Sequence, residues 1–205
     1  MRGRFITLEG IDGAGKSSHL DAIAAHLRAR GREVVVTREP GGTPAAERMR
    51  ELVLGTEMSP RAETLLVFTA RADHLERRVR PALDRGSDVL CDRFTDATYA
   101  YQCGGRGVPV DWVASLERLV HPDLQPDLVL LFDAEASLAQ ARRDARQGSD
   151  ADRFEREDRG FFERVRAHYL ERARAYPARY AVLDAARPLD VLRAEVLARV
   201  AHLPE

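Results

Sequence analysis

Five short apolar runs alternate with longer segments in which apolar residues return every three or four positions. The apolar runs predict strands at about residues 4–8, 33–37, 88–91, 127–133 and 180–184. The periodic segments predict helices at about residues 16–30, 44–54, 60–83, 110–120, 136–146, 161–176 and 188–202. Three consecutive valines in the second run are typical of a strand buried on both faces of a parallel sheet. The alternation therefore predicts an α/β fold built on a parallel sheet.

The turn after the first predicted strand is rich in glycine and fits the pattern G-x-x-x-x-G-K-[ST] without a mismatch. The stretch reads Gly10, Ile11, Asp12, Gly13, Ala14, Gly15, Lys16, Ser17 and Ser18. Glycines let backbone N–H groups converge on phosphate oxygens, and the following helix directs the positive end of its dipole to the same place. Lys16 can then reach the outer phosphates, and the Ser17 hydroxyl can ligate Mg²⁺. The alternative is a glycine-rich surface turn, but a strand before and a helix after it favour a phosphate loop.

Length and composition fit one globular domain over residues 1–205. The chain is 44% hydrophobic and 32% charged, and its formal net charge of −1 argues against a general nucleic-acid partner. No apolar run approaches the ~20 residues that span a bilayer, which argues against a membrane partner. Cys91 and Cys103 are too few for a disulfide framework, so a reducing cytoplasm is the expected setting.

The basic residues are almost all arginine, and Lys16 is the only lysine in the chain. A compositional bias explains the arginines, but it does not explain a lysine at the phosphate-loop position. Lys16 is therefore a candidate catalytic residue.

Polar residues follow two further predicted strands. Arg38 lies in a turn-rich stretch after the second strand, and in an open α/β sheet such loops line the ligand crevice. Asp92 ends the third strand, where phosphate-loop enzymes place a carboxylate associated with Mg²⁺. By contrast, Arg71 interrupts an apolar helical stripe, and the pattern alone favours a solvated arginine there. The segment 95–107 is expected to cap the fold and to end in an exposed loop.

A second polar segment, residues 142–153, is highly charged and nearly devoid of large apolar side chains. Such a stretch is not expected to pack into a core. It is either a solvated loop or a lid whose arginines swing over a charged substrate.

In their order along nearly the whole chain, these motifs resemble those of the thymidylate kinases, a family of nucleoside monophosphate kinases. The landmarks are the phosphate loop, the Thr-Arg-Glu-Pro-Gly-Gly-Thr stretch at 37–43, Asp92-Arg93-Phe94, Tyr101-Gln102 before 104–107, and Asp152-Arg153-Phe154-Glu155. The resemblance implies a P-loop NTPase-type three-layer fold, with a five-stranded parallel sheet flanked by helices and a short mobile lid at about 142–156. It implies transfer of the ATP γ-phosphoryl group to thymidine monophosphate, with Mg²⁺, by a homodimer.

The resemblance also implies a role for each site residue. Lys16 and the loop backbone hold the ATP phosphates, while Ser17 and Asp92 serve the metal. Asp12 faces the deoxyribose 3′-hydroxyl, and Arg38 and Arg93 grip the acceptor phosphate. Arg71 bonds the thymine edge. The remaining residues of the nucleoside pocket are Pro40, Phe68, Thr98, Tyr101 and Gln102, of which Tyr101 restricts a 2′-hydroxyl.

The chain departs from the family pattern at three positions. Val67 occupies the place where many members carry a phenylalanine that stacks on thymine, so either Phe68 stacks after a local shift or the base packs on an aliphatic surface. Ala97 stands where a serine is common. Gly13 stands where some members carry a basic residue, and the catalytic arginine is therefore expected from the lid, as Arg153 or Arg146. Of these two, Arg153 is preferred because it belongs to a landmark.

Two other functions remain open at this point. Another nucleoside or nucleotide kinase could use the same scaffold, although two arginines aimed at the acceptor suit a monophosphate better than an uncharged nucleoside. A phosphate-loop switch that hydrolyses nucleotide slowly is the second alternative, and an arginine-bearing lid argues against it.

Overall fold

A five-stranded parallel sheet forms the centre of the computed structural model, which describes residues 2–145 and 152–203. The strand order is β2-β3-β1-β4-β5, and every neighbouring pair is parallel. The strands are β1 (Phe5–Glu9), β2 (Val34–Arg38), β3 (Asp88–Asp92), β4 (Leu128–Asp133) and β5 (Tyr180–Asp184). Their carboxyl ends therefore meet at one edge, where the loops of an open α/β sheet form a ligand crevice.

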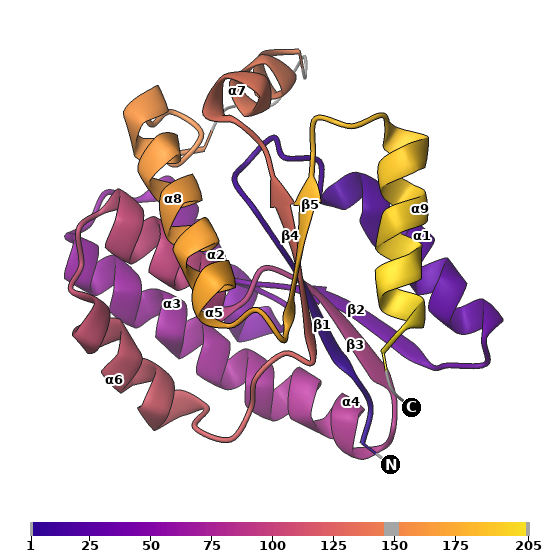
Figure 1. The fold of residues 1–205 in the computed structure, drawn as a ribbon. Helices are drawn as coiled ribbons and strands as arrows, with labels where there is room; N and C mark the ends of the chain where they lie inside the picture. The colour runs from indigo at the N-terminus through magenta and orange to yellow at the C-terminus, as the bar shows by residue number, and fades with distance from the viewer. Residues whose placement is uncertain (1, 146–151, 204–205) are drawn as a thin grey trace.

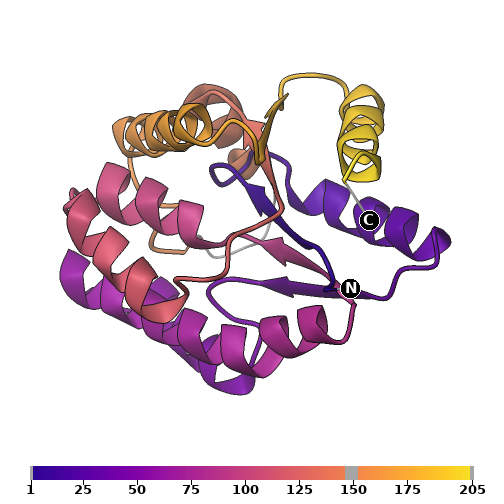
Figure 2. The same cartoon turned by 60° about the horizontal axis from the view of Figure 1, so that its bottom comes forward.

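Helices cover both faces of this sheet, which confirms the expected three-layer α/β architecture. Helices α1 (Ser17–Ala29) and α9 (Leu189–Ala201) pack together on one face (Figures 1 and 2). The other side carries α2 (Pro44–Gly55), α3 (Pro60–His74), α4 (Arg80–Asp84), α5 (Thr95–Thr98), α6 (Val110–Val120) and α8 (Arg159–Ala175). Helix α7 (Ala136–Asp144) lies beyond the carboxyl end of β4, at the top of Figure 1. No helix of the described ranges is long and apolar enough to cross a membrane.

The core follows from the apolar runs. All five residues of β1 are buried, and the largest buried cluster joins β1 and β4 to α1, α8 and α9. A polar residue, Glu9, ends this buried strand and is itself 0% exposed. It accepts hydrogen bonds from the Phe94 backbone N–H (2.6 Å) and the Tyr169 hydroxyl (2.9 Å). The carboxyl end of β1 is thus tied to the segment after β3 and to α8 just before the phosphate loop.

Two segments differ from the sequence-based expectation. The single helix predicted over 60–83 consists of α3, a π-helical turn η1 (Leu75–Val79) and α4. The segment expected to end in an exposed loop contains a second π-helical stretch, η2 (Tyr99–Gly105), in which all residues but the last are buried. Only the end of the segment is open, at the exposed Gly107, because the tyrosine and cysteine side chains of η2 pack against α3, α6 and α8.

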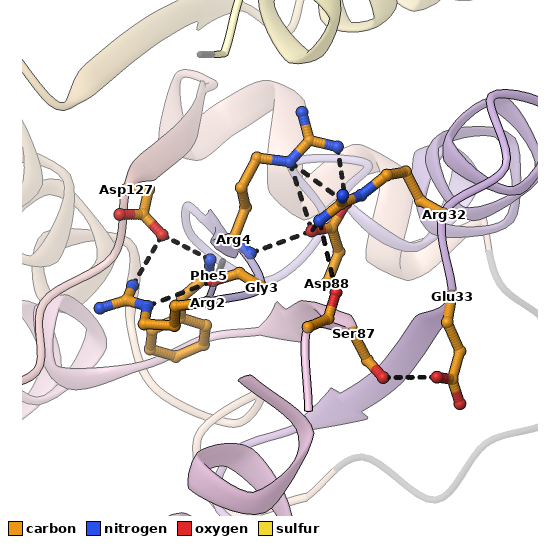
Figure 3. Close-up of polar contacts among 10 residues, drawn as sticks. Arg2, Gly3, Arg4, Phe5, Arg32, Glu33, Ser87, Asp88 and Asp127 are labelled. Atoms are coloured by element: carbon orange, nitrogen blue, oxygen red, sulfur yellow. Dashed lines mark hydrogen bonds and ion pairs between the residues drawn. The ribbon is translucent and has the colours of Figure 1, made fainter. Parts of the chain in front are cut away.

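A cluster of ion pairs secures the opposite edge of the sheet (Figure 3). The fully buried carboxylate of Asp88 receives the guanidinium groups of Arg4 at 2.6 Å and Arg32 at 2.8 Å. Burial alone would raise the pKa of Asp88, but the hydrogen bonds from Arg32 and Arg4 outweigh it and lower the pKa to about 2. Asp127 accepts from the Phe5 backbone N–H at 2.6 Å. These contacts connect β1, β3 and the segment before β4 at the end of the sheet opposite the crevice.

Candidate active site

The glycine-rich loop joins β1 to α1 and is closed over by α7. Gly13 has a φ of 87°, and a Cβ built there would lie 2.2 Å from the Ala139 carbonyl oxygen. A side chain therefore has no room at this position, because α7 packs directly on the loop. Lys16 is 6% exposed, and its Nζ donates to the carbonyls of Gly10 (2.9 Å) and Ile11 (3.1 Å). Burial, reinforced by the nearby charge of Arg93, lowers the pKa of Lys16 to about 8.

Arg93 and Asp12 form an ion pair at the mouth of this loop. Arg93 follows β3 directly and has a φ of 69°, a left-handed conformation that non-glycine residues seldom adopt. Its Nη2 lies 2.6 Å from Asp12 Oδ1, and the Tyr101 hydroxyl donates to Asp12 Oδ2 at 2.8 Å. Burial alone would raise the pKa of Asp12, but the charges of Arg93 and Lys16 hold it well below its usual range. The aspartate is therefore ionised at neutral pH and fixes the arginine.

Two cavities meet at this ion pair. The smaller has an empty volume of about 580 Å³ and lies between α2, α3 and η2. The larger, about 1640 Å³, follows the phosphate loop toward the segment after β5. Five residues line both: Asp12, Glu39, Arg50, Arg93 and Asp152. Two ligands bound in these cavities would therefore face each other across Asp12 and Arg93.

Arg71 provides a hydrogen-bond donor in the smaller cavity. The Arg71 side chain is 1% exposed, so the prediction of a solvated arginine, made from the helical pattern, was wrong. Its Nε donates to Glu39 at 2.7 Å and its Nη2 to Thr98 at 2.9 Å, while the buried Nη1 has no hydrogen-bond partner among the described residues. Since a buried N–H group without an acceptor is costly, Nη1 is a site for a ligand acceptor. Pro40, Tyr101 and Gln102 also line this cavity, as the family resemblance implies.

The structure decides between Val67 and Phe68. Val67 lines the smaller cavity, whereas Phe68 does not. The Phe68 ring is 2% exposed and packs in a cluster with Tyr99 and Cys103, with the Arg71 guanidinium 4.6 Å above it. The assignment of Phe68 to the nucleoside pocket is therefore wrong in this conformation, because adjacent helical residues point in directions about 100° apart. Phe68 instead packs against the Arg71 guanidinium.

The larger cavity contains the residues expected to serve a metal. Ser17 and Asp92 both line it, and within residues 2–145 and 152–203 no hydrogen-bond partner reaches the buried Asp92 Oδ1. A hydroxyl and an orphaned carboxylate oxygen fit Mg²⁺, which takes one or two protein ligands and completes its shell with phosphates and water. Within the described residues, no group of three or more His, Cys, Asp or Glu side chains could hold a metal by itself. Arg38 also lines the cavity, but its Nη2 pairs with Glu47 at 2.8 Å.

Of the two lid arginines, only Arg153 is described, and its position differs from expectation. Arg153 does not line the larger cavity, because its Nη2 donates to Glu63 (2.5 Å) and to the Val53 carbonyl (2.9 Å). In this conformation the Arg153 guanidinium is therefore held against α2 and α3, outside the lining of the larger cavity. The second candidate, Arg146, lies outside the described residues.

Three arginines that the sequence reasoning did not assign to the site lie close to it. Arg143 Nη1 donates to the Asp12 carbonyl at 2.6 Å, and Arg142 Nη2 to the Ala185 carbonyl at 2.9 Å. Arg50 lines both cavities and donates to the Pro40 carbonyl at 3.0 Å. The arginine-rich composition concealed them, and the only local signal for Arg142 and Arg143 was their place at the end of a helix that follows a strand.

Comparison with known proteins agrees with this geometry. The family model described as thymidylate kinase matches residues 8–196. Thymidylate kinase of Methylobacillus flagellatus is 57% identical over 197 residues, which cover 96% of each chain. The Bordetella petrii thymidylate kinase is 55% identical over 205 residues, which cover 100% of this chain and 98% of the relative. A crystal structure of thymidylate kinase from Ehrlichia chaffeensis superposes with a TM-score of 0.79 at 30% identity, over 98% of this chain and 99% of that one.

Proposed function

The chain belongs to the thymidylate kinase family, and from this membership we propose that the smaller cavity binds thymidine monophosphate and the larger cavity binds ATP. The protein phosphorylates thymidine monophosphate to thymidine diphosphate with ATP, a step of nucleotide biosynthesis. The alternative of another nucleotide kinase on this scaffold has no support among the relatives. The arrangement that carries the proposal is the pair of cavities that meet at Asp12 and Arg93.

In the proposed acceptor cavity, the free Nη1 of Arg71 bonds the edge of thymine, and Val67 packs against the base. Thr98 and Gln102 add polar contacts, and Tyr101 lies against the sugar. Asp12 lies where the 3′-hydroxyl would be, and Arg93 holds the acceptor phosphate at the boundary. Arg38 joins Arg93 only if it leaves Glu47, an exchange open to it because its side chain is 53% exposed.

In the proposed donor site, the loop backbone from Gly10 to Ser18 and Lys16 Nζ hold the ATP phosphates. Ser17 and Asp92 would hold a Mg²⁺ ion, which when bound supplies positive charge to the β- and γ-phosphates. The acceptor phosphate is already an anionic nucleophile, so the site needs no strong general base. Alignment of the two phosphates and neutralisation of the charge by Lys16 and Arg93 therefore provide most of the rate.

The wider organisation is also part of the proposal. We place the activity in one domain over residues 1–205, with residues 142–156 as its lid. Since both substrates are charged nucleotides, the cytoplasm is the setting in which they are available. A homodimer with α3 in its interface is supported by Leu65 of α3 and Leu52 of the adjoining α2, which are 47% and 51% exposed. Neither a nucleic acid nor a membrane is a proposed partner.

The test is a coupled assay of ATP with each nucleoside monophosphate in turn. Thymidine monophosphate should be the best acceptor and ribonucleotides poor ones. Deoxyuridine monophosphate lacks only a methyl group, worth about 1 kcal/mol of apolar burial, so it should be modestly weaker. Equal efficiency with cytidine or adenosine monophosphate would contradict the assignment of the acceptor cavity. Light scattering on the same preparation, with Leu65→Asp as the disrupted variant, tests the dimer.

A further inference from the structure

Residues 152–154 lie in a turn at the wall of the acceptor cavity, and the Arg153 guanidinium lies 4.9 Å from the centre of the Phe154 ring. Asp152 and Phe154 line the cavity, whereas Arg153 between them does not. Phe154 is 7% exposed, and its ring meets Tyr101 edge-on at 5.7 Å between centroids. The direction of Arg153 therefore determines where the two cavity-facing side chains are held.

Arg153 is anchored at three points on the body of the protein. Its backbone N–H donates to the Leu54 carbonyl at 3.3 Å, and its Nη2 donates to the Val53 carbonyl at 2.9 Å. The same Nη2 lies 2.5 Å from Glu63 Oε2. Two of these contacts are to the end of α2, and the third is the only one of the three that involves a charged partner.

Glu63 also contacts residues other than Arg153. Its side chain is 0% exposed, and its second oxygen, Oε1, accepts from the amide Nε2 of Gln102 at 2.8 Å. Arg106 Nε lies 3.7 Å from Oε2, and Arg106 in turn pairs with Glu157 at 2.5 Å. The buried carboxylate of Glu63 on α3 thus contacts Gln102 of η2, Arg106 just after η2, and Arg153 of the segment after residue 151.

An acid in the first turn of a helix has a simpler use, which is to interact with the helix dipole. That use requires neither full burial nor a cationic partner, and Glu63 has both. Contact with Gln102 has a further consequence, because the amide nitrogen of a cavity-lining residue is engaged and the amide oxygen is left for a ligand. Both oxygens of Glu63 therefore act on walls of the same cavity.

We propose that Glu63 is a positioning residue for the acceptor: through Arg153 it fixes the wall formed by residues 152–154, and through Gln102 it orients a polar group opposite. Arg153 is then an anchor of the acceptor cavity and not the arginine that meets the transferring phosphoryl group. This inference rests on the proposed placement of thymidine monophosphate in the smaller cavity.

The experiment compares Glu63→Gln, Arg153→Gln and the double variant with the unmodified chain. Glutamine keeps the size of Glu63 and an oxygen for Gln102, but it removes the charge that holds Arg153. Calorimetric titration should show that each single variant binds thymidine monophosphate at least about tenfold more weakly, a loss of about 1.4 kcal/mol. ATP affinity should stay unchanged, and kcat should fall less than the acceptor KM rises. The double variant should be little weaker than either single one, because both changes remove the same contact.

Glu163→Gln is the matched control. It makes the same chemical change in an exposed ion pair with Arg159 on α8, at 2.7 Å, and thymidine monophosphate affinity should not change. If Glu63→Gln does not fold, Arg153→Gln decides, since the Arg153 side chain is 16% exposed and Arg106, 3.7 Å from Glu63 Oε2, still faces the buried carboxylate. Unchanged acceptor affinity, or a fall in kcat without a rise in acceptor KM, would overturn the positioning role. Failure of the unmodified chain to bind thymidine monophosphate would instead refute the proposed acceptor site.

Discussion

Arg93 Nη2 donates to Asp12 Oδ1 at 2.6 Å, so the residue after β3 is tied to the loop after β1 at the boundary between the two cavities. The pair lies where the acceptor phosphate and the donor phosphates would approach. An ion pair at this place keeps the guanidinium ready for an anionic ligand, because a partly buried arginine without a carboxylate partner would be costly.

Replacement of Asp12 by asparagine should therefore lower kcat by about tenfold or more, since Arg93 loses the charge that orients it. Steady-state kinetics with thymidine monophosphate measures this effect. Tyr101→Phe is the comparison variant, because it removes a hydroxyl that donates to Asp12 and accepts from Arg93 Nη2 at 3.1 Å but leaves the ion pair. It should cost less in kcat than Asp12→Asn, and the reverse order would contradict the role of the pair.

Lys16→Ala should lower kcat by about 10²-fold, the effect of losing one preorganised charge contact of about 3 kcal/mol. The fold should remain intact, because Lys16 Nζ contacts only carbonyls of its own loop, at 2.9 and 3.1 Å. Turnover assays with a parallel thermal melt separate these two effects. A kcat within about threefold of the unmodified chain, which is under 1 kcal/mol, would exclude Lys16 from the phosphate site.

Val67 and Phe68 should give opposite phenotypes. Phe68→Ala should destabilise the fold by about 3–5 kcal/mol, as expected for a buried aromatic residue, with a smaller effect on the acceptor KM. Val67→Ala removes apolar surface from the acceptor cavity, so it should raise that KM several-fold. Chemical denaturation and acceptor titrations on both variants make the comparison. A strong KM effect for Phe68→Ala at full stability would show that Phe68 stacks on the base.

Arg146 remains the lid arginine predicted to meet the transferring phosphoryl group. Arg146→Ala should lower kcat far more than it raises the ATP KM, because such a contact forms in the closed transition state and can be worth about 10³-fold. Arg156→Ala, an exposed arginine of the same segment, is the control and should have near-normal kcat. Normal kcat for Arg146→Ala would leave the charge to Arg93, Lys16 and the arginines of α7.

Glu9 should make stability depend on pH. Burial, with repulsion from Asp96, raises the pKa of Glu9 from 4.5 to about 8. Between these two values the native state retains a proton that the unfolded chain has released, so the free energy of unfolding should fall as pH rises from about 4.5 to 8. Glu9→Gln mimics the protonated form and should remove this part of the slope. Urea denaturation of both proteins at pH 5, 6.5 and 8 tests it, and parallel pH profiles would contradict the raised pKa.

The strands, the phosphate loop and the family could all be predicted from the amino-acid sequence. The apolar runs match the strands because β1, β3 and β4 are buried along almost their whole length, which requires an unbroken apolar stretch. The edge strands β2 and β5 are only partly buried, so the three valines of β2 are not covered on both faces as expected. The phosphate loop at residues 10–18 could also be predicted, because its backbone N–H groups, lysine and hydroxyl are all adjacent in the chain. The positions of Arg71, Thr98 and Gln102 in one cavity were implied by the resemblance and not by any local pattern.

The directions of individual side chains, by contrast, were known only from the three-dimensional structure. It showed that Val67, and not Phe68, faces the acceptor cavity. Adjacent helical residues point about 100° apart, and the apolar periodicity does not show which of them faces a cavity. It paired Arg153 with Glu63, which is 90 residues away in the chain. It also showed that Arg142 and Arg143 lie near the phosphate loop, because α7, which carries them, packs on Gly13. Such contacts depend on which elements meet in space, and the sequence carries no local record of that.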